Sequence, residues 1–221
     1  MALVEINGKY GYYDKTGNLA IPAIFDEAEN FDNGLAIVKN DDKYGCIDKT
    51  GKYIIKTICD TIESFKNGIA IVILNGKYGL IDKTGKFVVP ASYDWIGDFS
   101  EGLAAVQING KYGFIDKNGK LIIPTKYDII SRFNKGLALV VINGKWGYID
   151  KTGKLVIPAT FDRAWWFSDE LATVVINGKY GYIDKTGKLV IPAIFDNAYN
   201  FLEGVAAVKF NGKWGFIKYN K

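Results

Sequence analysis

The sequence predicts an all-β protein built from tandem repeats, and three observations carry that prediction. Two nearly identical stretches of seventeen residues, "NGKWGYIDKTGKLVIPA" and "NGKYGYIDKTGKLVIPA", open at Asn143 and at Asn177. A glycine that follows an aromatic residue recurs every 34 residues without an insertion. Short apolar, β-branched runs alternate with Asn-Gly and Thr-Gly turns, a pattern typical of short antiparallel strands. We therefore expect one supersecondary unit stacked on copies of itself.

The recurring glycine defines about six and a half repeats, at Gly11, Gly45, Gly79, Gly113, Gly147, Gly181 and Gly215. We expect a single repeat domain over residues 1–221. Its units start near residues 8, 42, 76, 110, 144 and 178, and a final half unit starts at about residue 205.

The first half of each repeat is predicted to be a β-hairpin. From Gly136, "GLALVVI" has the composition of a strand buried on both faces. Asn143-Gly144 is the dipeptide that most favours a two-residue type I′ turn, because both central residues need positive φ. "KWGYID" is then the return strand, and Gly147 within it indicates close approach of a neighbouring backbone.

The second half of the repeat is predicted to add a turn and further strands. In "DKTG", Asp150 can accept backbone N–H bonds, and Gly153 can take the left-handed conformation. "KLVIP" is predicted as a third strand that stops at Pro158. "TFDRAWWF", from Thr160, is predicted as a fourth, outer strand, with a short irregular connection as the alternative.

The columns "GKWG", "ID", "TGK", "VIP" and "FD" resemble the bacterial WG (or KWG) repeat over nearly the whole chain. The sequence departs from that pattern in its aromatic column, where tryptophan stands only at Trp146 and Trp214 and tyrosine fills the other places. Lys56 also replaces a proline found in other repeats. The resemblance implies an interaction module with no shared catalytic residues.

A sheet of three or four short antiparallel strands must bury both of its faces against neighbouring sheets. Two architectures allow this. The absence of polar caps favours a propeller-like closed ring. An open β-solenoid is the alternative, and the half repeat argues for it. A compact chain of this length would have a radius of gyration of about 17 Å, and an open stack would exceed it.

Composition, charge and apolar runs indicate which partners and which cellular location to expect. Apolar residues make up 48% of the chain and prolines number only five, which indicates a folded core. The net charge of +4 is spread among interspersed lysines and aspartates, so we expect neither nucleic acid nor a membrane surface as a partner. The sequence shows no secretory signal and no membrane-length apolar run. We therefore expect a cytoplasmic protein, unless this chain is part of a longer one.

Missing residue types argue against catalysis. The chain has no histidine, which removes Ser-His-Asp and Cys-His constellations and histidine-based metal sites. Phosphate-binding glycine loops are also missing. We therefore expect a protein that is not an enzyme, with no cofactor and no metal. Cys46 and Cys59 stand at apolar columns and are interpreted as reduced, buried residues, with a disulfide between them as the alternative.

Two charged columns recur with the repeat. A lysine follows each hairpin turn and is interpreted as a solvated row, the alternative being a basic ridge for an acidic partner. An aspartate follows each third strand and is interpreted as an acceptor of backbone hydrogen bonds, the alternative being a carboxylate ring for metal or acid–base chemistry. The aspartates are Asp26, Asp60, Asp94, Asp128, Asp162 and Asp196.

The segment between this aspartate and the next "GLA" differs most between repeats, and it concentrates tryptophan and arginine. These residue types are enriched in binding hot spots, so they are the candidate binding residues, although packing between units is the alternative role. The candidates are Trp95, Arg132, Arg163, Trp165, Trp166 and Tyr199. The predicted function is a non-catalytic binding or scaffolding module for a protein partner. Lectin-like carbohydrate binding through surface tryptophans, or a carboxylate-dependent glycoside hydrolase, are the alternatives.

Overall fold

Residues 1–219 are described in the computed structural model, and they form 26 β-strands and no helix. The strands pair into antiparallel sheets of three or four, each an open sheet with two edge strands. The predicted all-β architecture of repeated three- to four-stranded sheets is therefore confirmed. Within the described residues no helix is long and apolar enough to cross a membrane.

The chain divides into two compact units, Met1–Ile96 and Gly97–Lys221. The division falls inside strand β12 (Trp95–Ser100), so the repeat pattern runs on through both units. A single domain over residues 1–221 and closure of the sheets into a ring both stay predictions.

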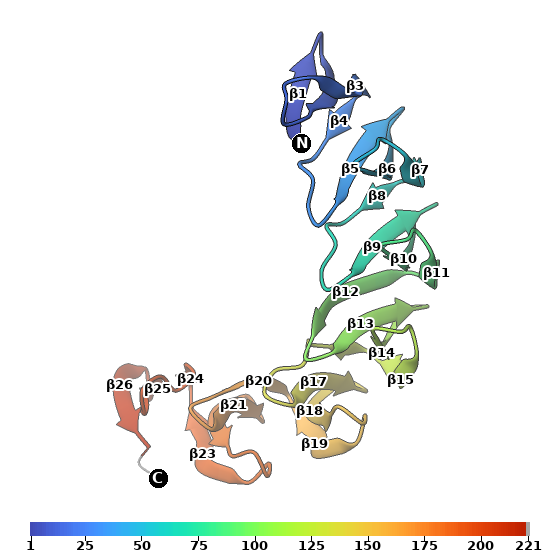
Figure 1. Ribbon diagram of the computed structural model, residues 1–221. Helices are drawn as coiled ribbons and strands as arrows, with labels where there is room; N and C mark the ends of the chain where they lie inside the picture. The colour runs from blue at the N-terminus through green and yellow to red at the C-terminus, as the bar shows by residue number, and fades with distance from the viewer. Residues whose placement is uncertain (220–221) are drawn as a thin grey trace. The chain divides into compact units, whose positions relative to one another are not determined.

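In the first unit, three sheets follow one another along the chain (Figure 1). The first sheet contains β1 (Ala2–Ile6), β2 (Lys9–Tyr13) and β3 (Leu19–Phe25). The second contains β4 (Glu27–Ala28), β5 (Leu35–Asn40), β6 (Lys43–Asp48) and β7 (Tyr53–Cys59). The third contains β8 (Thr61–Ile62), β9 (Ile69–Leu74), β10 (Lys77–Asp82) and β11 (Phe87–Tyr93).

The second unit repeats the same strand order in its sheets. The sheet that begins with β12 adds β13 (Leu103–Ile108), β14 (Lys111–Asp116) and β15 (Leu121–Tyr127). The next contains β16 (Ile129–Ile130), β17 (Leu137–Ile142), β18 (Lys145–Asp150) and β19 (Leu155–Phe161). Then come β20 (Arg163–Ser168), β21 (Leu171–Ile176), β22 (Lys179–Ile183) and β23 (Leu189–Phe195). The last sheet contains β24 (Asn197–Ala198), β25 (Val205–Phe210) and β26 (Lys213–Lys218).

Both predicted turns form as expected. Asn143 and Gly144 have φ of 49° and 75°, the two positive values that a type I′ hairpin needs between β17 and β18. In the second turn, Asp150 Oδ1 accepts the N–H groups of Thr152 at 2.9 Å and Lys154 at 3.1 Å. Gly153 has φ of 83°, which confirms its left-handed conformation.

The third strand does not stop at its proline, which corrects the prediction. Strand β19 continues through Pro158 to Phe161, because Pro158 lies in an irregularity between the pairs Tyr148↔Ile157 and Trp146↔Phe161. Three residues of β19 there stand opposite the single residue Gly147, so the missing proline N–H removes no ladder bond.

The predicted fourth strand exists, but it pairs with the following repeat. Strand β20 pairs antiparallel with β21 and so opens the next sheet, instead of lying at the outside of its own repeat. The equivalent strands β4, β8, β16 and β24 have only two residues, whereas β12 and β20 have six.

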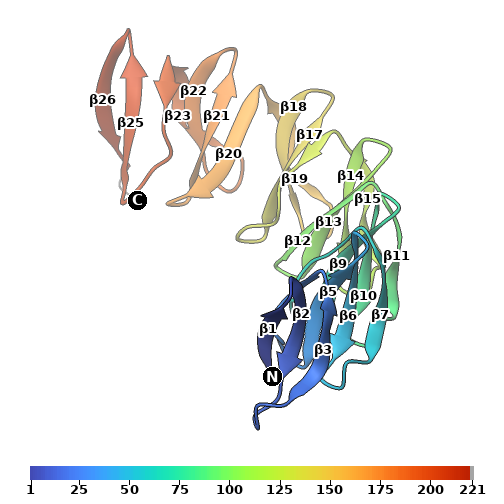
Figure 2. The same cartoon turned by 90° about the horizontal axis from the view of Figure 1, so that it is seen from above.

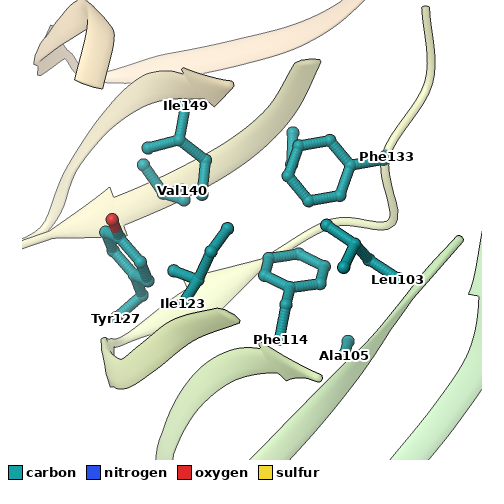
Figure 3. Packing of buried hydrophobic residues seen from close by; sticks show 9 residues of the cluster. Leu103, Ala105, Phe114, Ile123, Tyr127, Phe133, Val140 and Ile149 are labelled. Carbon is teal, nitrogen blue, oxygen red and sulfur yellow. The ribbon is translucent and has the colours of Figure 1, made fainter. Parts of the chain in front are cut away.

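Within each unit, the core consists of apolar layers between successive sheets. In one layer Phe114 of β14 meets Phe133, which precedes β17, with ring centroids 4.7 Å apart (Figure 3). Burying each such aromatic side chain contributes roughly 2–3 kcal/mol. Cys46 and Cys59 lie in another layer, both free and buried, which confirms the reduced interpretation. Burial raises the pKa of the Cys46 thiol to about 11.

Candidate functional site

Strand β20 carries a β-bulge that displaces two tryptophans from the regular pleat. Ala164 pairs with Val174, and Phe167 pairs with Ala172, so two residues of β20 stand opposite one residue of β21. These two residues are Trp165 and Trp166. Ala164 and Phe167 are both buried, and the two tryptophans between them are half-buried at the surface of the sheet. Bulges commonly re-aim side chains in this way.

Trp165 is fixed at two points. Its carbonyl oxygen accepts a hydrogen bond of 2.6 Å from the hydroxyl of Tyr148, which belongs to the preceding sheet. Its indole stacks on Tyr180 of β22, with ring centroids 5.8 Å apart and planes at 27°. Offset stacking of this kind adds about 0.5–1.5 kcal/mol beyond area burial.

Tyr199 repeats this arrangement 34 residues later. The hydroxyl of Tyr182 donates to its carbonyl oxygen at 2.7 Å, and its ring stacks on Trp214 of β26 with centroids 5.6 Å apart and planes at 25°. The side chain of Tyr199 is nevertheless 62% exposed. We call these two stacked pairs, Trp165–Tyr180 and Tyr199–Trp214, the aromatic ladder, because they occupy equivalent positions of adjacent sheets.

The hydroxyls of Tyr148 and Tyr182, which donate to the backbone carbonyls of the aromatic ladder, remain protonated. Desolvation by burial raises the pKa of Tyr182 to about 12. The same cause raises the pKa of Tyr148. Both hydroxyls therefore keep their protons across the physiological range and continue to donate to the ladder carbonyls.

The other predicted residues are placed differently. Trp166 is half-buried and packs against the apolar layer that contains Phe167, so it contributes to packing. Arg132, in the segment before β17, and Arg163, at the start of β20, are exposed. Trp95 is 38% exposed at the start of β12, within the first unit. The binding role of all six candidates stays a prediction.

Sequence reasoning missed two members of the ladder. Tyr180 and Trp214 are not among the candidate residues, because an aromatic residue fills their column in every repeat. The ladder could have been found by comparing two columns, the one that contains Tyr180 and Trp214 and the one that contains Trp165 and Tyr199. Only in the repeats of Trp165 and Tyr199 is the partner position also aromatic, whereas the earlier repeats carry Glu29, Glu63, Gly97 and Ser131 there.

The two charged columns pair with each other. In six repeats the lysine after the hairpin turn binds the aspartate 17 residues later, as in Lys179–Asp196 at 2.7 Å. The second carboxylate oxygen of Asp196 accepts the N–H of Gly212, in the hairpin turn of the next repeat, at 3.0 Å. The aspartate column therefore connects consecutive turns, which confirms its interpretation as an acceptor of backbone hydrogen bonds.

This pairing sets the protonation state of the aspartates. The hydrogen bond from Lys179 lowers the pKa of the Asp196 carboxyl, and the amide of Gly212 acts in the same direction. The corresponding lysines lower the pKa values of Asp26, Asp60, Asp128 and Asp162. A general acid needs the opposite shift, toward a raised pKa.

A family model described as WG containing repeat matches six consecutive segments of the chain. The chain belongs to this family. The matched segments are 10–44, 44–78, 78–112, 112–146, 146–180 and 180–214. The predicted WG-repeat resemblance is thus confirmed over most of the sequence.

The chain is also similar to several solved structures. One is Hsv2p of Kluyveromyces lactis, at 14% identity, with 88% of this chain and 74% of that chain covered and a TM-score of 0.44. A second is BamB of Moraxella catarrhalis, at 10% identity, 80% and 64% coverage and a TM-score of 0.37. A third is YCF48 bound to D1 peptide, at 13% identity, 83% and 74% coverage and a TM-score of 0.36. A search of curated proteins found no match.

Proposed function

We propose that this WG-repeat protein is a non-catalytic binding or scaffolding module that presents the aromatic ladder to a protein partner. The Tyr199–Trp214 pair is the observation that carries the proposal. Its tyrosine is largely exposed, yet its ring is stacked and its backbone carbonyl is held by a buried phenol. Large aromatic surfaces that are already rigid lose little conformational entropy on binding, which makes them effective interface anchors.

The remaining recurrent polar residues support a scaffold role. The lysines and aspartates of six repeats are engaged in ion pairs that connect turns, and the turn aspartates bind their own loop amides. The variation between repeats is concentrated in the segment that includes Trp165 and Tyr199. A constant scaffold with a variable surface is the expected design of a binding module.

Quantitative pull-down from a cell extract tests the proposal with a Trp165→Ala, Tyr199→Ala variant. Trp166 is left intact because its loss would disturb the core layer. The matched control is Tyr53→Ala, which removes an exposed aromatic residue from the first unit. We expect a protein that wild type and control capture equally and that the double variant loses. Equal capture by all three folded proteins would contradict the proposal.

Carbohydrate binding is the second candidate, and the exposed ring of Tyr199 favours it because aromatic faces stack on sugar rings. A glycan array probed with wild type and with Tyr199→Ala tests it, the expected result being a hit that the variant loses. The glycoside hydrolase alternative finds no support, since the aspartates are paired with lysines and their pKa values are lowered. Turnover of chromogenic glycosides would contradict the non-catalytic proposal.

A further inference from the structure

Glu29, which directly follows β4, stands at the position that an aromatic side chain occupies in the aromatic ladder. It precedes Trp165 by four whole repeats. Its backbone is held in the same way, because the hydroxyl of Tyr12 donates to the Glu29 carbonyl oxygen at 2.6 Å, as a buried phenol does to Trp165. The equivalent of Tyr180 is Tyr44 on β6, the neighbour of β5 in the second sheet (Figure 2). The same backbone arrangement therefore carries a carboxylate in place of a ring.

This exchange leaves a hollow between Glu29 and Tyr44. In the ladder, the ring of Trp165 stacks on that of Tyr180 with centroids 5.8 Å apart. Glu29 has no ring to cover Tyr44, and a hollow of about 130 Å³ lies between them. It has room for roughly four water molecules, or for one guanidinium group. Its other lining residues are Glu27, Ala28, Ile37, Val38 and Lys39.

The hollow and its rim carry more negative than positive charge. The ammonium of Lys39 donates to Glu27 Oε1 at 2.8 Å and lies 3.4 Å from Oδ1 of Asp42. Within residues 1–219 no lysine or arginine forms an ion pair with Glu29. Three carboxylates therefore lie around a single ammonium group, and the excess favours a cationic ligand.

The ring of Tyr44 already contacts one cation. The ammonium of Lys39 lies 5.5 Å from the centroid of this ring, within the range of a cation–π contact. A guanidinium group is planar, stacks on aromatic faces and forms two parallel hydrogen bonds to a carboxylate. It combines the flat shape of the ring that fills this place in the ladder with the charge that Glu29 requires. An ammonium group supplies only the charge.

A polar surface continues from the hollow, away from Tyr44. Glu29 and Ile37 also border a second hollow of about 30 Å³, whose lining includes Asp32 and Ser64. A peptide chain that carries the guanidinium group would find hydrogen-bonding side chains there. Free arginine would instead bring its own carboxylate close to Glu29 and Asp32.

We propose that this hollow binds the guanidinium group of an arginine side chain in a protein partner. The guanidinium stacks on the ring of Tyr44 and pairs with the carboxylate of Glu29. The site lies in the first unit and shares no residue with the aromatic ladder. A negative result for the ladder variants therefore leaves this inference standing.

The probe is the capped tripeptide N-acetyl-Gly-Arg-Gly-amide, titrated into the isotopically labelled full chain at constant ionic strength. We expect saturable NMR shifts of the backbone amides in residues 27–44, with a dissociation constant of about 1 mM, the weak end of specific recognition. Binding should be lost in large part when citrulline replaces arginine, because citrulline is flat but uncharged. It should weaken several-fold when lysine replaces arginine, because an ammonium group does not stack.

Two substitutions at position 29 test the place of binding. Glu29→Gln should weaken binding at least about fivefold, because a charge-assisted pair of hydrogen bonds is lost. Glu29→Trp should abolish it by filling the hollow, and it should fold because it copies the Trp165–Tyr180 pair. The matched control is Glu63→Gln, one repeat later, where the uncharged Thr61 and Ile73 replace Glu27 and Lys39. It changes the net charge equally and should leave binding unchanged.

Lys39→Met tests the sign of the electrostatic effect. Removal of this competing cation should strengthen binding of the arginine peptide about threefold, the size expected for exposed charges. Weaker binding to this variant would contradict the proposed excess of negative charge.

Four results would overturn the proposal. These are the absence of saturable shifts at about 20 mM peptide, equal affinity for the arginine and lysine peptides, unchanged binding by Glu29→Trp, and equal losses in Glu29→Gln and Glu63→Gln. Free L-arginine separates the two sources of a guanidinium group. Tighter binding of the tripeptide than of the free amino acid would support a protein partner, and the reverse order would overturn that assignment.

Discussion

The sheet β20–β23 and the sheet β24–β26 contain hairpins of the same residue pattern but differ in what covers them. In the first, Gly181 lies against the backbone of β23 and Tyr182 is fully buried. In the second, Gly215 faces open space and Phe216 is 80% exposed. The same residue pattern therefore serves as core in one sheet and as surface in the other. The neighbouring strand decides which role a repeated residue has.

This comparison also explains why repetition alone did not separate scaffold from surface. A residue that recurs in every repeat has one sequence signature, but its energetic role depends on whether the adjoining strand is present. Valine substitutions, aromatic truncations and charge removals at equivalent positions of the two sheets therefore test whether the adjoining strand has this effect.

The largest contrast is expected between Gly181→Val and Gly215→Val. The valine at position 181 would collide with the backbone of Ile191 and Ala193, which cannot move without loss of the β22–β23 pairing. We expect a loss of about 3–5 kcal/mol in the free energy of unfolding, in the range of severe overpacking. Gly215→Val should change it by less than about 0.5 kcal/mol. Urea denaturation followed by far-UV circular dichroism measures both, and equal losses would contradict the comparison.

Truncation of the next residue should show a similar but smaller contrast. Tyr182→Ala removes a buried ring and the hydroxyl that donates to Tyr199, so we expect a loss of about 3–4 kcal/mol. Phe216→Ala should lose less than about 1 kcal/mol because its ring is already solvated. Tyr182→Phe separates the hydrogen bond from the packing, with an expected loss of about 1 kcal/mol. Thermal unfolding of the three variants provides the measurement.

The two tryptophans of the β20 bulge should differ more modestly. Trp166→Ala removes a side chain from the apolar layer, and we expect about 2–3 kcal/mol of lost stability. Trp165→Ala removes a stacked ring at the surface, and we expect about 1 kcal/mol. Chemical denaturation of both variants tests this order. The reverse order would mean that Trp165, and not Trp166, fills the core.

Acidification should produce the smallest difference between the sheets. The folded-state pKa of Asp196 is lowered by Lys179, so its ion pair stabilises the fold above the unfolded pKa of about 3.9. That contribution is lost as the pH falls through the folded pKa. Lys179→Met should therefore reduce the drop in melting temperature between pH 7 and pH 3, whereas Lys213→Met should leave the drop unchanged. Equal acid sensitivity in the two variants would contradict the role assigned to Asp196.

The sequence predicted the repeated parts well, because their signals are local. Asn143-Gly144 determines its turn through φ alone, and Gly147 indicated the close approach of β19 correctly. Pro158 was misjudged because its tolerance depends on the irregularity opposite Gly147, which is a property of strand pairing. The pairing of β20 with β21 depends on which neighbouring sheet has an unpaired edge strand. The stacking of Tyr199 on Trp214 likewise requires knowledge of neighbours that single-repeat patterns do not contain.

The short sequence distance between paired strands has a consequence for how the protein folds. In the strand pairings described above, no registered partners lie further apart in sequence than Tyr180 and Phe195. Slow folding in β proteins comes largely from the entropy of closing long loops before their contacts form. Each sheet here can form from its own neighbourhood, so the chain should fold faster than β-sandwiches of similar size. Addition or removal of a whole repeat would leave unchanged the length of the loops that the remaining sheets must close as they fold.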